Sequence, residues 1–512
     1  MGANTFVTGT WILIAVYMIA ILFFVIRGAV KIKSMSDYTL GNINFSPVTV
    51  GLSLAASITS AATFVINPGF IANYGISGVL SFGIFFPAAT MISLVILTKS
   101  FRKQGSKFKS LTLAQWIGDR YNSKGYAFLM AMLSMLMITF IVLIIVAISK
   151  VLSKALDVNE MNVMVAVVVF VFGYMMFGGA NSMVYTNTIQ AVIMIVVAFV
   201  LLTSGYEHFR DGIGVFMAKL SAIDPALVKT TNPGSLLFRD YYEIIFAQIV
   251  IGAAVVVQPH IITKSLLLKK DSDVNKFLAV AVGAEILFFA VVITGLYARI
   301  TFPDLMYHGQ ALKNDGIISA YVVERFSDGF FSVIVGLIVI LGLISAGLST
   351  LEGLIQSVSA TFTNDIVKPI AGKRLNDRKL IFINRMAIIA LAIISIIISR
   401  DQLLHPKLSV GLLAQNGVYA YFSAAFIPVL FGIFMKKTDY RAPLIATITA
   451  IVVHFGVYYG LPILVNQYGI SFGFFTKYLT GVVRNPAIAA STAIIVSTIT
   501  GLILNTVLKK RI

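Results

Sequence analysis

Long apolar segments recur along the whole of this chain. Each has about twenty residues or more, the length that a helix needs to cross the ~30 Å hydrocarbon core of a bilayer. Only 12% of the 512 residues are charged, which is about half the share in a typical soluble protein. We therefore expect an all-α, multi-pass protein of the cell membrane. Its thirteen predicted spans are 8–28, 46–74, 77–99, 126–155, 161–178, 183–205, 241–263, 277–302, 329–363, 380–399, 414–435, 442–465 and 486–508.

Positively charged residues predict how these spans are oriented. The loops and ends on one side hold 25 of the 39 Lys and Arg residues, and those on the other side hold 12. Because Lys and Arg gather on the cytoplasmic side of membrane proteins, we expect the N-terminus outside and the C-terminus inside. Lys264 belongs to the cytoplasmic set and is expected to lie too close to the cytoplasm to bind a substrate. The net charge of +18 is then a topology signal, and no nucleic acid partner is expected.

The span at 46–74 is unusually polar in its middle. In hydrocarbon, every backbone N–H and C=O needs a partner, so a helix can open only where protein or a water-filled cavity satisfies the freed groups. This pattern favours a discontinuous helix that lines a transport site. The alternative is an ordinary helix whose small residues let a neighbour pack closely. The interrupting residues are Ser53, Ser57, Thr59, Ser60 and Thr63, followed by Asn67, Pro68 and Gly69.

The spans also divide into two sets of five. An odd number of spans in each set means that the second set has inverted topology, and each set begins with an interrupted span, the second one at Gln258-Pro259-His260. Paired interruptions at matching positions indicate a transporter site, although proline is common in spanning helices. The predicted parts are a leading helix and cytoplasmic linker (1–45), a first repeat (46–205), an extracellular loop (206–240), a second repeat (241–435) and two accessory helices (436–512).

The segment 341–365 presents one polar face at helical spacing. Ser349 and Thr350 provide adjacent hydroxyls, and the carbonyl of Ala346 lies about one turn earlier. Oxygen ligands of this kind suit a hard cation such as sodium. The alternative is that Ser and Thr simply form hydrogen bonds between packed helices.

Several short motifs occur in a fixed order and carry a resemblance. With them, the chain resembles the sodium/solute symporter family over nearly its whole length, a family that includes carriers of proline, pantothenate, short monocarboxylates and glucose. The resemblance implies a leucine-transporter-like fold, with one helix before two inverted five-helix repeats and two helices after them. The motifs are Asp37–Gly41, Thr112–Leu113 with Arg120–Tyr121, Gly178–Gly179, Val184–Asn187 with Gln190, Gln258–Ile261 and Ala346–Thr350.

The same resemblance implies a sodium site between the first and eighth core helices. Its ligands would be the main-chain oxygens of Ala55, Ile58 and Ala346 and the hydroxyls of Ser349 and Thr350. Two departures from the family pattern matter. Asn187 stands where many members have Asp, so one coupling sodium is expected, and Ser57 stands where the proline branch has Asp, which weighs against proline.

Glu352 is the most unusual residue among the spans. A carboxylate at membrane depth is costly and is a functional hypothesis by default. It could serve as a proton site, a cation ligand or a partner for a buried base, so a proton-coupled carrier that uses Glu352 is the alternative function. Asn187 and Glu352 are therefore the coupling candidates, whereas Glu285 is expected to pair within the bundle.

The substrate is expected near the midplane, between the two interrupted spans. Candidate contacts are Ser57, Thr59, Thr63 and Gln258. The segments around Thr63 and Gln258 resemble the carboxylate and amino-acid branches of the family more than the sugar branch. We expect a symporter that uses sodium to import a small carboxylate, monocarboxylate-like or pantothenate-like, or an amino acid, with a sugar symporter as the alternative.

Other functional classes fit the sequence less well. A channel would show rings of like residues, and an intramembrane enzyme would show paired carboxylates or a metal cluster, whereas the five histidines are scattered. We therefore expect no enzymatic activity and no cofactor, with sodium as the coupling ion, membrane lipid around the protein, and a monomer sufficient for transport.

Overall fold

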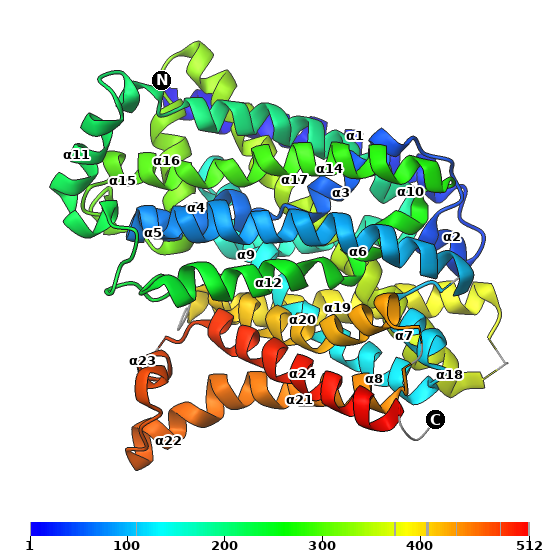
Figure 1. Cartoon of the computed structure of the whole chain (residues 1–512). Coiled ribbons are helices and arrows are strands. Elements are labelled where there is room, and N and C mark those ends of the chain that lie inside the picture. The colour runs from blue at the N-terminus through cyan, green and yellow to red at the C-terminus, as the bar shows by residue number, and fades with distance from the viewer. Residues whose placement is uncertain are drawn as a thin grey trace.

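The computed structural model describes residues 2–108, 110–372, 375–405, 409–436, 438–481 and 483–509. In this part the chain forms a bundle of long helices that lie side by side (Figure 1). Some basic residues counted in the topology prediction lie outside the described residues, namely Lys109, Lys373, Arg374, Lys407, Lys437, Lys510 and Arg511.

The first half of the bundle leads into a segment that joins the two halves. The elements of the first half are α1 (Gly2–Ala29), α2 (Met35–Leu40), α3 (Pro47–Ile58), η1 (Ala62–Ile66), α4 (Asn67–Tyr74), α5 (Ile76–Gly78), η2 (Val79–Phe85), α6 (Phe86–Phe108), α7 (Leu113–Tyr121), α8 (Lys124–Ser134), η3 (Met135–Met137), α9 (Ile138–Leu156) and α10 (Glu160–Thr203). The connecting elements are η4 (Tyr206–Phe209), α11 (Ile213–Ile223) and η5 (Pro225–Val228).

The second half also begins with a bent helix pair and ends with further helices. Its elements are η6 (Tyr242–Ala247), α12 (Gln248–Ala254), η7 (Val255–Val257), α13 (Pro259–Ile262), η8 (Thr263–Leu267), η9 (Asp271–Asp273), α14 (Val274–Ala290), η10 (Val291–Ile293), α15 (Thr294–Thr301), η11 (Asn314–Gly316), α16 (Ile317–Phe326), α17 (Phe330–Thr361), η12 (Phe362–Val367), α18 (Lys368–Ala371), α19 (Asp377–Leu404) and α20 (Val410–Phe434). The last elements are α21 (Arg441–Phe455), η14 (Gly456–Gly460), α22 (Leu461–Tyr468), η15 (Gly473–Phe475), α23 (Thr476–Leu479) and α24 (Pro486–Lys509).

One short hairpin departs from the expected all-α class. β1 (Met306–Tyr307) pairs antiparallel with β2 (Gln310–Ala311) in the connection after α15. The rest of the regular structure in the described residues is helical.

Both interruptions expected from the sequence are present. Among the described residues, ten helices are long and apolar enough to span a membrane, and two bent pairs raise the number to twelve. Pro47–Ile58 and Ala62–Tyr74 meet at 54°, and Tyr242–Val257 and Pro259–Leu267 meet at 62°. The first break falls in the Ser/Thr-rich centre. The expected interruption at Asn67, Pro68 and Gly69 is wrong, because these residues form the first turn of α4 inside the second half-helix.

The long element α10 contains a further break. Its 44 residues would extend about 66 Å at ~1.5 Å per residue, about twice the hydrocarbon thickness. Gly179 has φ 58° and ψ −166° in its middle, a backbone conformation outside the helical region. Counting α10 as two spans brings the twelve to the expected thirteen, and that exact number stays a prediction.

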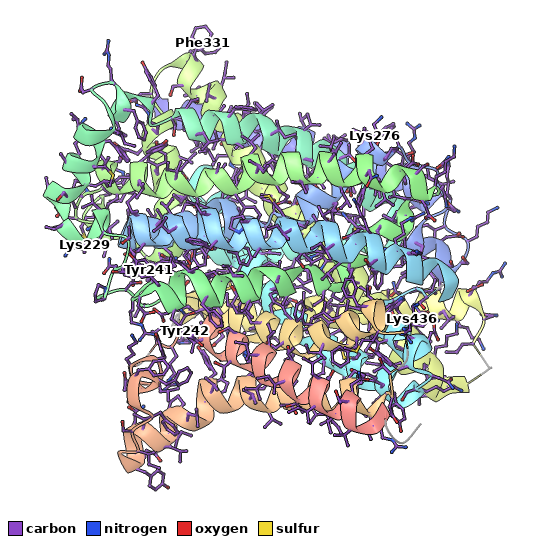
Figure 2. The ribbon with its side chains drawn as sticks, in the orientation of Figure 1. Lys229, Tyr241, Tyr242, Lys276, Phe331 and Lys436 are labelled. Atoms are coloured by element: carbon purple, nitrogen blue, oxygen red, sulfur yellow. The ribbon has the colours of Figure 1, made fainter. Side chains whose placement is uncertain are left out.

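The two termini lie at opposite ends of the bundle (Figure 1). An odd number of spans requires this arrangement. Lys276 and Lys436, both expected in the cytoplasm, lie at one end, and Lys229, expected outside, lies at the other (Figure 2). The segregation of basic residues agrees with the expected topology, while the side that faces the cytoplasm stays a prediction of the charge pattern.

Helix α3 lies in the interior of the bundle. Ser46 caps its N-terminus by accepting a hydrogen bond from the Thr49 N–H, and Pro47 occupies the first turn, where its missing N–H costs nothing. Small residues bring neighbouring helices close. A Cβ on Gly51 would lie only 2.7 Å from the carbonyl oxygen of Phe277 on α14. As a result, α3 packs against α10, α14 and α17.

Candidate functional site

Helix α3 ends inside the protein, beside α17. Ala55 closes the last turn by accepting a hydrogen bond from the Thr59 N–H at 3.0 Å. Thr59 itself is extended (φ −81°, ψ 112°), so the chain leaves the helix before it resumes at Ala62. In hydrocarbon, such an opening must be satisfied by neighbouring protein groups.

The hydroxyls of Ser349 and Thr350 lie directly against this break. Ser349 Oγ donates to the carbonyl oxygen of Ala56 at 2.7 Å and lies 3.2 Å from that of Ala346. Thr350 Oγ1 lies 3.2 Å from the carbonyl oxygen of Thr59 and 3.3 Å from that of Ser57. Two segments nearly 300 residues apart in sequence therefore meet at a cluster of neutral oxygens.

The sodium ligands expected from the sequence fall in and around this cluster. Ala346, Ser349 and Thr350 are fully buried there, and Ala55 lies in the adjoining last turn of α3. Ile58 lines the neighbouring cavity. The approach of the Ala56 and Thr59 carbonyls was not expected, because the direction of a carbonyl at the end of a helix depends on the exact residue at which the helix opens.

A cavity lies between the two bent helices. Its volume is about 90 Å³. By the same measure one water molecule needs about 10–15 Å³. The cavity can therefore hold a small organic molecule. Among the described residues, its lining contains no Asp, Glu, Lys, Arg or His. The polar lining residues are Ser60, Thr63, Asn67, Thr90, Gln258, Gln415 and Tyr419, and the phenyl rings are those of Phe82, Phe86, Phe140, Phe289 and Phe422.

Two of the four expected substrate contacts line this cavity. These are Thr63 and Gln258, and the Gln258 Oε1 atom is buried with no hydrogen-bond partner in the described residues. Ser57 instead contacts Lys264, and Thr59 Oγ1 donates to both carboxylate oxygens of Glu285 at 3.0 Å. Glu285 was expected to pair within the bundle, and its carboxylate does contact Thr59 at the break of the first bent span.

The structure corrects the assignment of Lys264 to a cytoplasmic loop, because the residue lies in the buried element η8 (Thr263–Leu267). Its side chain is 2% exposed. Its Nζ donates to the carbonyl oxygen of Ser53 at 2.6 Å, to Ser53 Oγ at 2.8 Å and also to Ser57 Oγ. The sequence pattern ended the span at 263, whereas the bend at Pro259 directs a second half-helix through Leu267 along the protein interior. The flexible Lys264 side chain then reaches α3.

Glu352 lies one turn beyond Ser349 on α17 and is fully buried. Its carboxylate accepts hydrogen bonds from Tyr174 Oη and Thr186 Oγ1, each at 2.5 Å, and from Gln190 Nε2 at 3.4 Å. The Tyr174 contact was missed by the sequence analysis. The sequence feature that could have indicated this contact was the Tyr174 hydroxyl in the strongly apolar span at 161–178.

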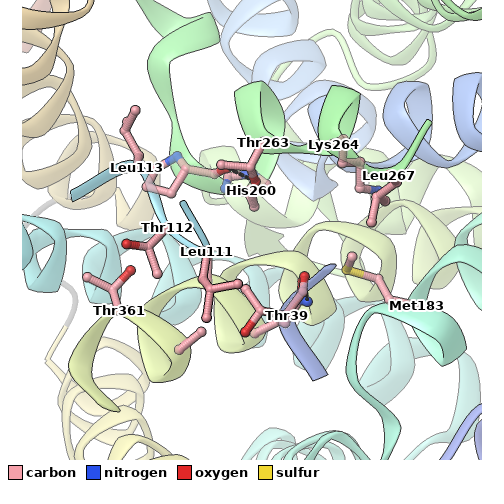
Figure 3. A pocket seen from close by; sticks show the side chains of 14 residues that line it. Thr39, Leu111, Thr112, Leu113, Met183, His260, Thr263, Lys264, Leu267 and Thr361 are labelled. Atoms are coloured by element: carbon pink, nitrogen blue, oxygen red, sulfur yellow. Dashed lines mark hydrogen bonds between the residues drawn. The ribbon is translucent and has the colours of Figure 1, made fainter. Parts of the chain in front are cut away.

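A smaller pocket is lined in part by Lys264. Thr39, Thr112, His260 and Lys264 are among its lining residues (Figure 3). Gln356 Nε2 donates to the carbonyl oxygens of Tyr38 and Thr39 at 3.0 and 2.8 Å. These contacts join α17 to the α2 segment, at the end of the bundle that the charge pattern assigns to the cytoplasm.

Two bent spans with a largely apolar cavity between them, which has a few polar lining groups, define the class of protein. In secondary transporters, discontinuous helices of this kind form the substrate and ion sites near the membrane midplane. The sequence model of the Sodium:solute symporter family matches residues 38–450. The chain belongs to this family, and it is a multi-pass transporter of the cell membrane rather than an enzyme.

Three curated relatives show the range of the family around this chain. The sodium/pantothenate symporter of Escherichia coli (strain K12) is 24% identical over 421 residues, which cover 81% of this chain and 82% of that protein. The high-affinity proline transporter PutP of Bacillus subtilis (strain 168) is 23% identical, with coverage of 80% and 83%. The sodium/proline symporter of Staphylococcus aureus is 25% identical, with coverage of 83% and 81%.

A solved structure supports the fold. A Na⁺-coupled sialic acid symporter, in a substrate-bound outward-open state, matches with a TM-score of 0.71 and 16% identity over 97% of this chain and 98% of that one. The overall architecture is therefore that of the leucine-transporter-like sodium symporters, as the sequence resemblance implied. The family match supports sodium as the coupling ion.

Proposed function

We propose that this protein is a symporter that imports a small organic solute together with one sodium ion. The proposed ion ligands are the main-chain oxygens of Ala55, Ile58 and Ala346 and the hydroxyls of Ser349 and Thr350. The observation that carries this proposal is the contact of both hydroxyls with the carbonyls of Ala56 and Thr59, the sequence neighbours of Ala55 and Ile58 at the break of α3. Neutral oxygens suit a hard monovalent cation and need no compensating buried charge.

The proposed mechanism is coupled alternating access. Sodium bound between α3 and α17 would hold these helices together and order the neighbouring cavity for the solute. A tenfold gain in solute affinity corresponds to a coupling free energy of about 1.4 kcal/mol, and the solute must raise sodium affinity by the same factor. Separation of α3 from α17 would then release the ion on the other side.

The proposed solute is an amino acid or a small carboxylate. Pantothenate, proline and sialic acid, the solutes named for the relatives and the structural neighbour, all carry a carboxylate. The described part of the cavity lining has no charged side chain to bind one, but the half-helix that begins at Ala62 presents its N-terminal end there. A helix N-terminus attracts negative charge. Ser57, in place of the Asp of the proline branch, weighs against proline.

A screen of thermal unfolding tests this proposal. Amino acids and small carboxylates are added to the purified protein in sodium or in choline. We expect one class of solute to raise the melting temperature in sodium only, because a ligand that binds only the folded state stabilises it. Equal stabilisation in choline, with uptake that follows a proton gradient, would instead favour the proton-coupled carrier that uses Glu352. A solute with a sugar ring and no carboxylate as the strongest ligand would favour the sugar symporter.

Two lining substitutions separate solute binding from ion binding. Thr63→Val and Gln258→Leu each remove a polar contact in the cavity and leave the hydroxyl pair on α17 untouched. Each is expected to raise the KM for the solute by about fivefold to tenfold, the value of one hydrogen bond. The sodium concentration for half-maximal stabilisation should stay unchanged. A change in sodium dependence without a change in solute KM would remove these residues from the solute site.

A further inference from the structure

The Lys264 ammonium occupies a small cage of oxygens that the sodium proposal does not use. Three of its contacts come from two residues one turn apart on α3, namely the Ser53 carbonyl, the Ser53 hydroxyl and the Ser57 hydroxyl. No carboxylate lies within ion-pair distance of Lys264 in the described residues. A buried ammonium in such a cage is costly unless a negative charge lies nearby.

Asn187 links this ammonium to the buried carboxylate of Glu352. With its amide oxygen toward α3, Asn187 Oδ1 accepts hydrogen bonds from Lys264 Nζ at 3.0 Å and from Ser57 Oγ at 2.9 Å. Its Nδ2 then donates to Glu352 Oε2 at 3.2 Å and to Gln190 Oε1 at 3.1 Å. One amide thus separates the positive charge of Lys264 from the negative charge of Glu352.

This charged network adjoins the proposed sodium site on both helices. Ser57 follows Ala56, whose carbonyl accepts the Ser349 hydroxyl, and Glu352 lies three residues after Ser349 on α17. Any ion bound at the hydroxyl pair therefore feels both the ammonium and the carboxylate at short range in a medium of low dielectric constant.

We propose that the Lys264 ammonium is a built-in cation that fills a second monovalent-cation site, with Glu352 as its counter-charge and Asn187 as the bridge. This proposal rests on the sodium site at Ser349 and Thr350. The protein then supplies one of two positive charges itself, so one free sodium ion completes the site. The Lys264–Glu352 pair is neutral overall, which keeps the ammonium from repelling that ion.

Sodium titrations of thermal unfolding test the proposal without a known solute. Sodium replaces choline at constant ionic strength, and the half-maximal sodium concentration and the Hill coefficient are measured. In Glu352→Gln the uncompensated ammonium repels sodium, so the half-maximal concentration should rise about tenfold or more. In Lys264→Met the empty oxygen cage and free carboxylate should accept another sodium ion, and the Hill coefficient should rise from about one toward two.

The double variant Lys264→Met/Glu352→Gln separates a charge effect from a packing effect. It carries neither charge, so its half-maximal sodium concentration should return to within about threefold of the wild-type value, with a Hill coefficient near one. Lys276→Met, which removes an exposed lysine on α14, is the matched control and should leave the titration unchanged.

Each result has a distinct meaning. The proposal is overturned if Glu352→Gln lowers the melting temperature but leaves the sodium titration unchanged, or if the double variant binds sodium no better than Glu352→Gln. Glu352→Gln is a nearly isosteric substitution. Its sodium titration, compared with that of the wild type, therefore tests the proposal even if Lys264→Met does not fold. Absence of any sodium effect in the wild-type protein would instead remove the sodium site itself.

Discussion

Replacing Ser349 and Thr350 together by alanine is expected to abolish sodium-driven uptake while the protein stays folded. The two hydroxyls are the side-chain ligands proposed for the ion, and they also join α17 to the carbonyls of Ala56 and Thr59. Their loss leaves main-chain oxygens as the remaining proposed ligands. The expected effect is a rise of about 100-fold or more in the sodium concentration for half-maximal uptake, or about 2.7 kcal/mol at 1.36 kcal/mol per tenfold.

The measurement is solute uptake by proteoliposomes under an imposed sodium gradient. Ser357→Ala serves as the control on the same helix, because the Ser357 hydroxyl donates to the Leu354 carbonyl of its own helix. It should leave sodium dependence unchanged, and both variants should elute as folded protein. Uptake at the wild-type sodium concentration in the double alanine variant would contradict the proposed site.

Gly179→Val is expected to cause the largest loss of stability among single substitutions at the helix breaks. Gly179 has φ 58° and ψ −166°, a region that essentially only glycine occupies, at a cost of order 1–3 kcal/mol for other residues. A Cβ there would also lie 2.9 Å from the carbonyl oxygen of Tyr38. Because Gly179 separates the two halves of α10, the substitution should displace α2 or straighten the break.

The unfolding temperature in detergent and the yield of monodisperse protein measure this effect. Gly173→Ala is the matched control on the same element, since a Cβ at Gly173 meets no atom within 4 Å and alanine is the better helix former. That variant should be as stable as the wild type or slightly more stable. A Gly179→Val protein with wild-type stability would show that α10 does not need this conformation.

Much of the architecture could be predicted from local chemistry. The Ser/Thr-rich centre of 46–74 indicated an interruption, and the bend of 54° lies there. Gln258-Pro259 indicated the second, and the bend of 62° lies at that point. Ser349 and Thr350 were selected as a hydroxyl pair, and the structure places them against the first break.

Other parts of the site depended on distances that no local pattern contains. Lys264 was assigned to a loop because the run of apolar residues ended before it, whereas its ammonium contacts Ser53 and Ser57. Ser57 and Thr59 were selected as solute contacts, but their hydroxyls contact Lys264 and Glu285. Neighbouring residues at a helix end point in different directions, so a shift of one residue changes the partner of each hydroxyl.

The amino-acid sequence by itself determined that the chain spans a membrane many times, that two of its spans are interrupted, and which side chains carry oxygen there. The physical reason is that hydrocarbon demands long apolar runs and paired backbone groups, and both demands act on consecutive residues. Only the tertiary structure decided which carbonyls meet the Ser349 and Thr350 hydroxyls and that Lys264 connects through Asn187 to Glu352. These contacts join segments up to about 300 residues apart, and their geometry follows from bend angles and helix packing.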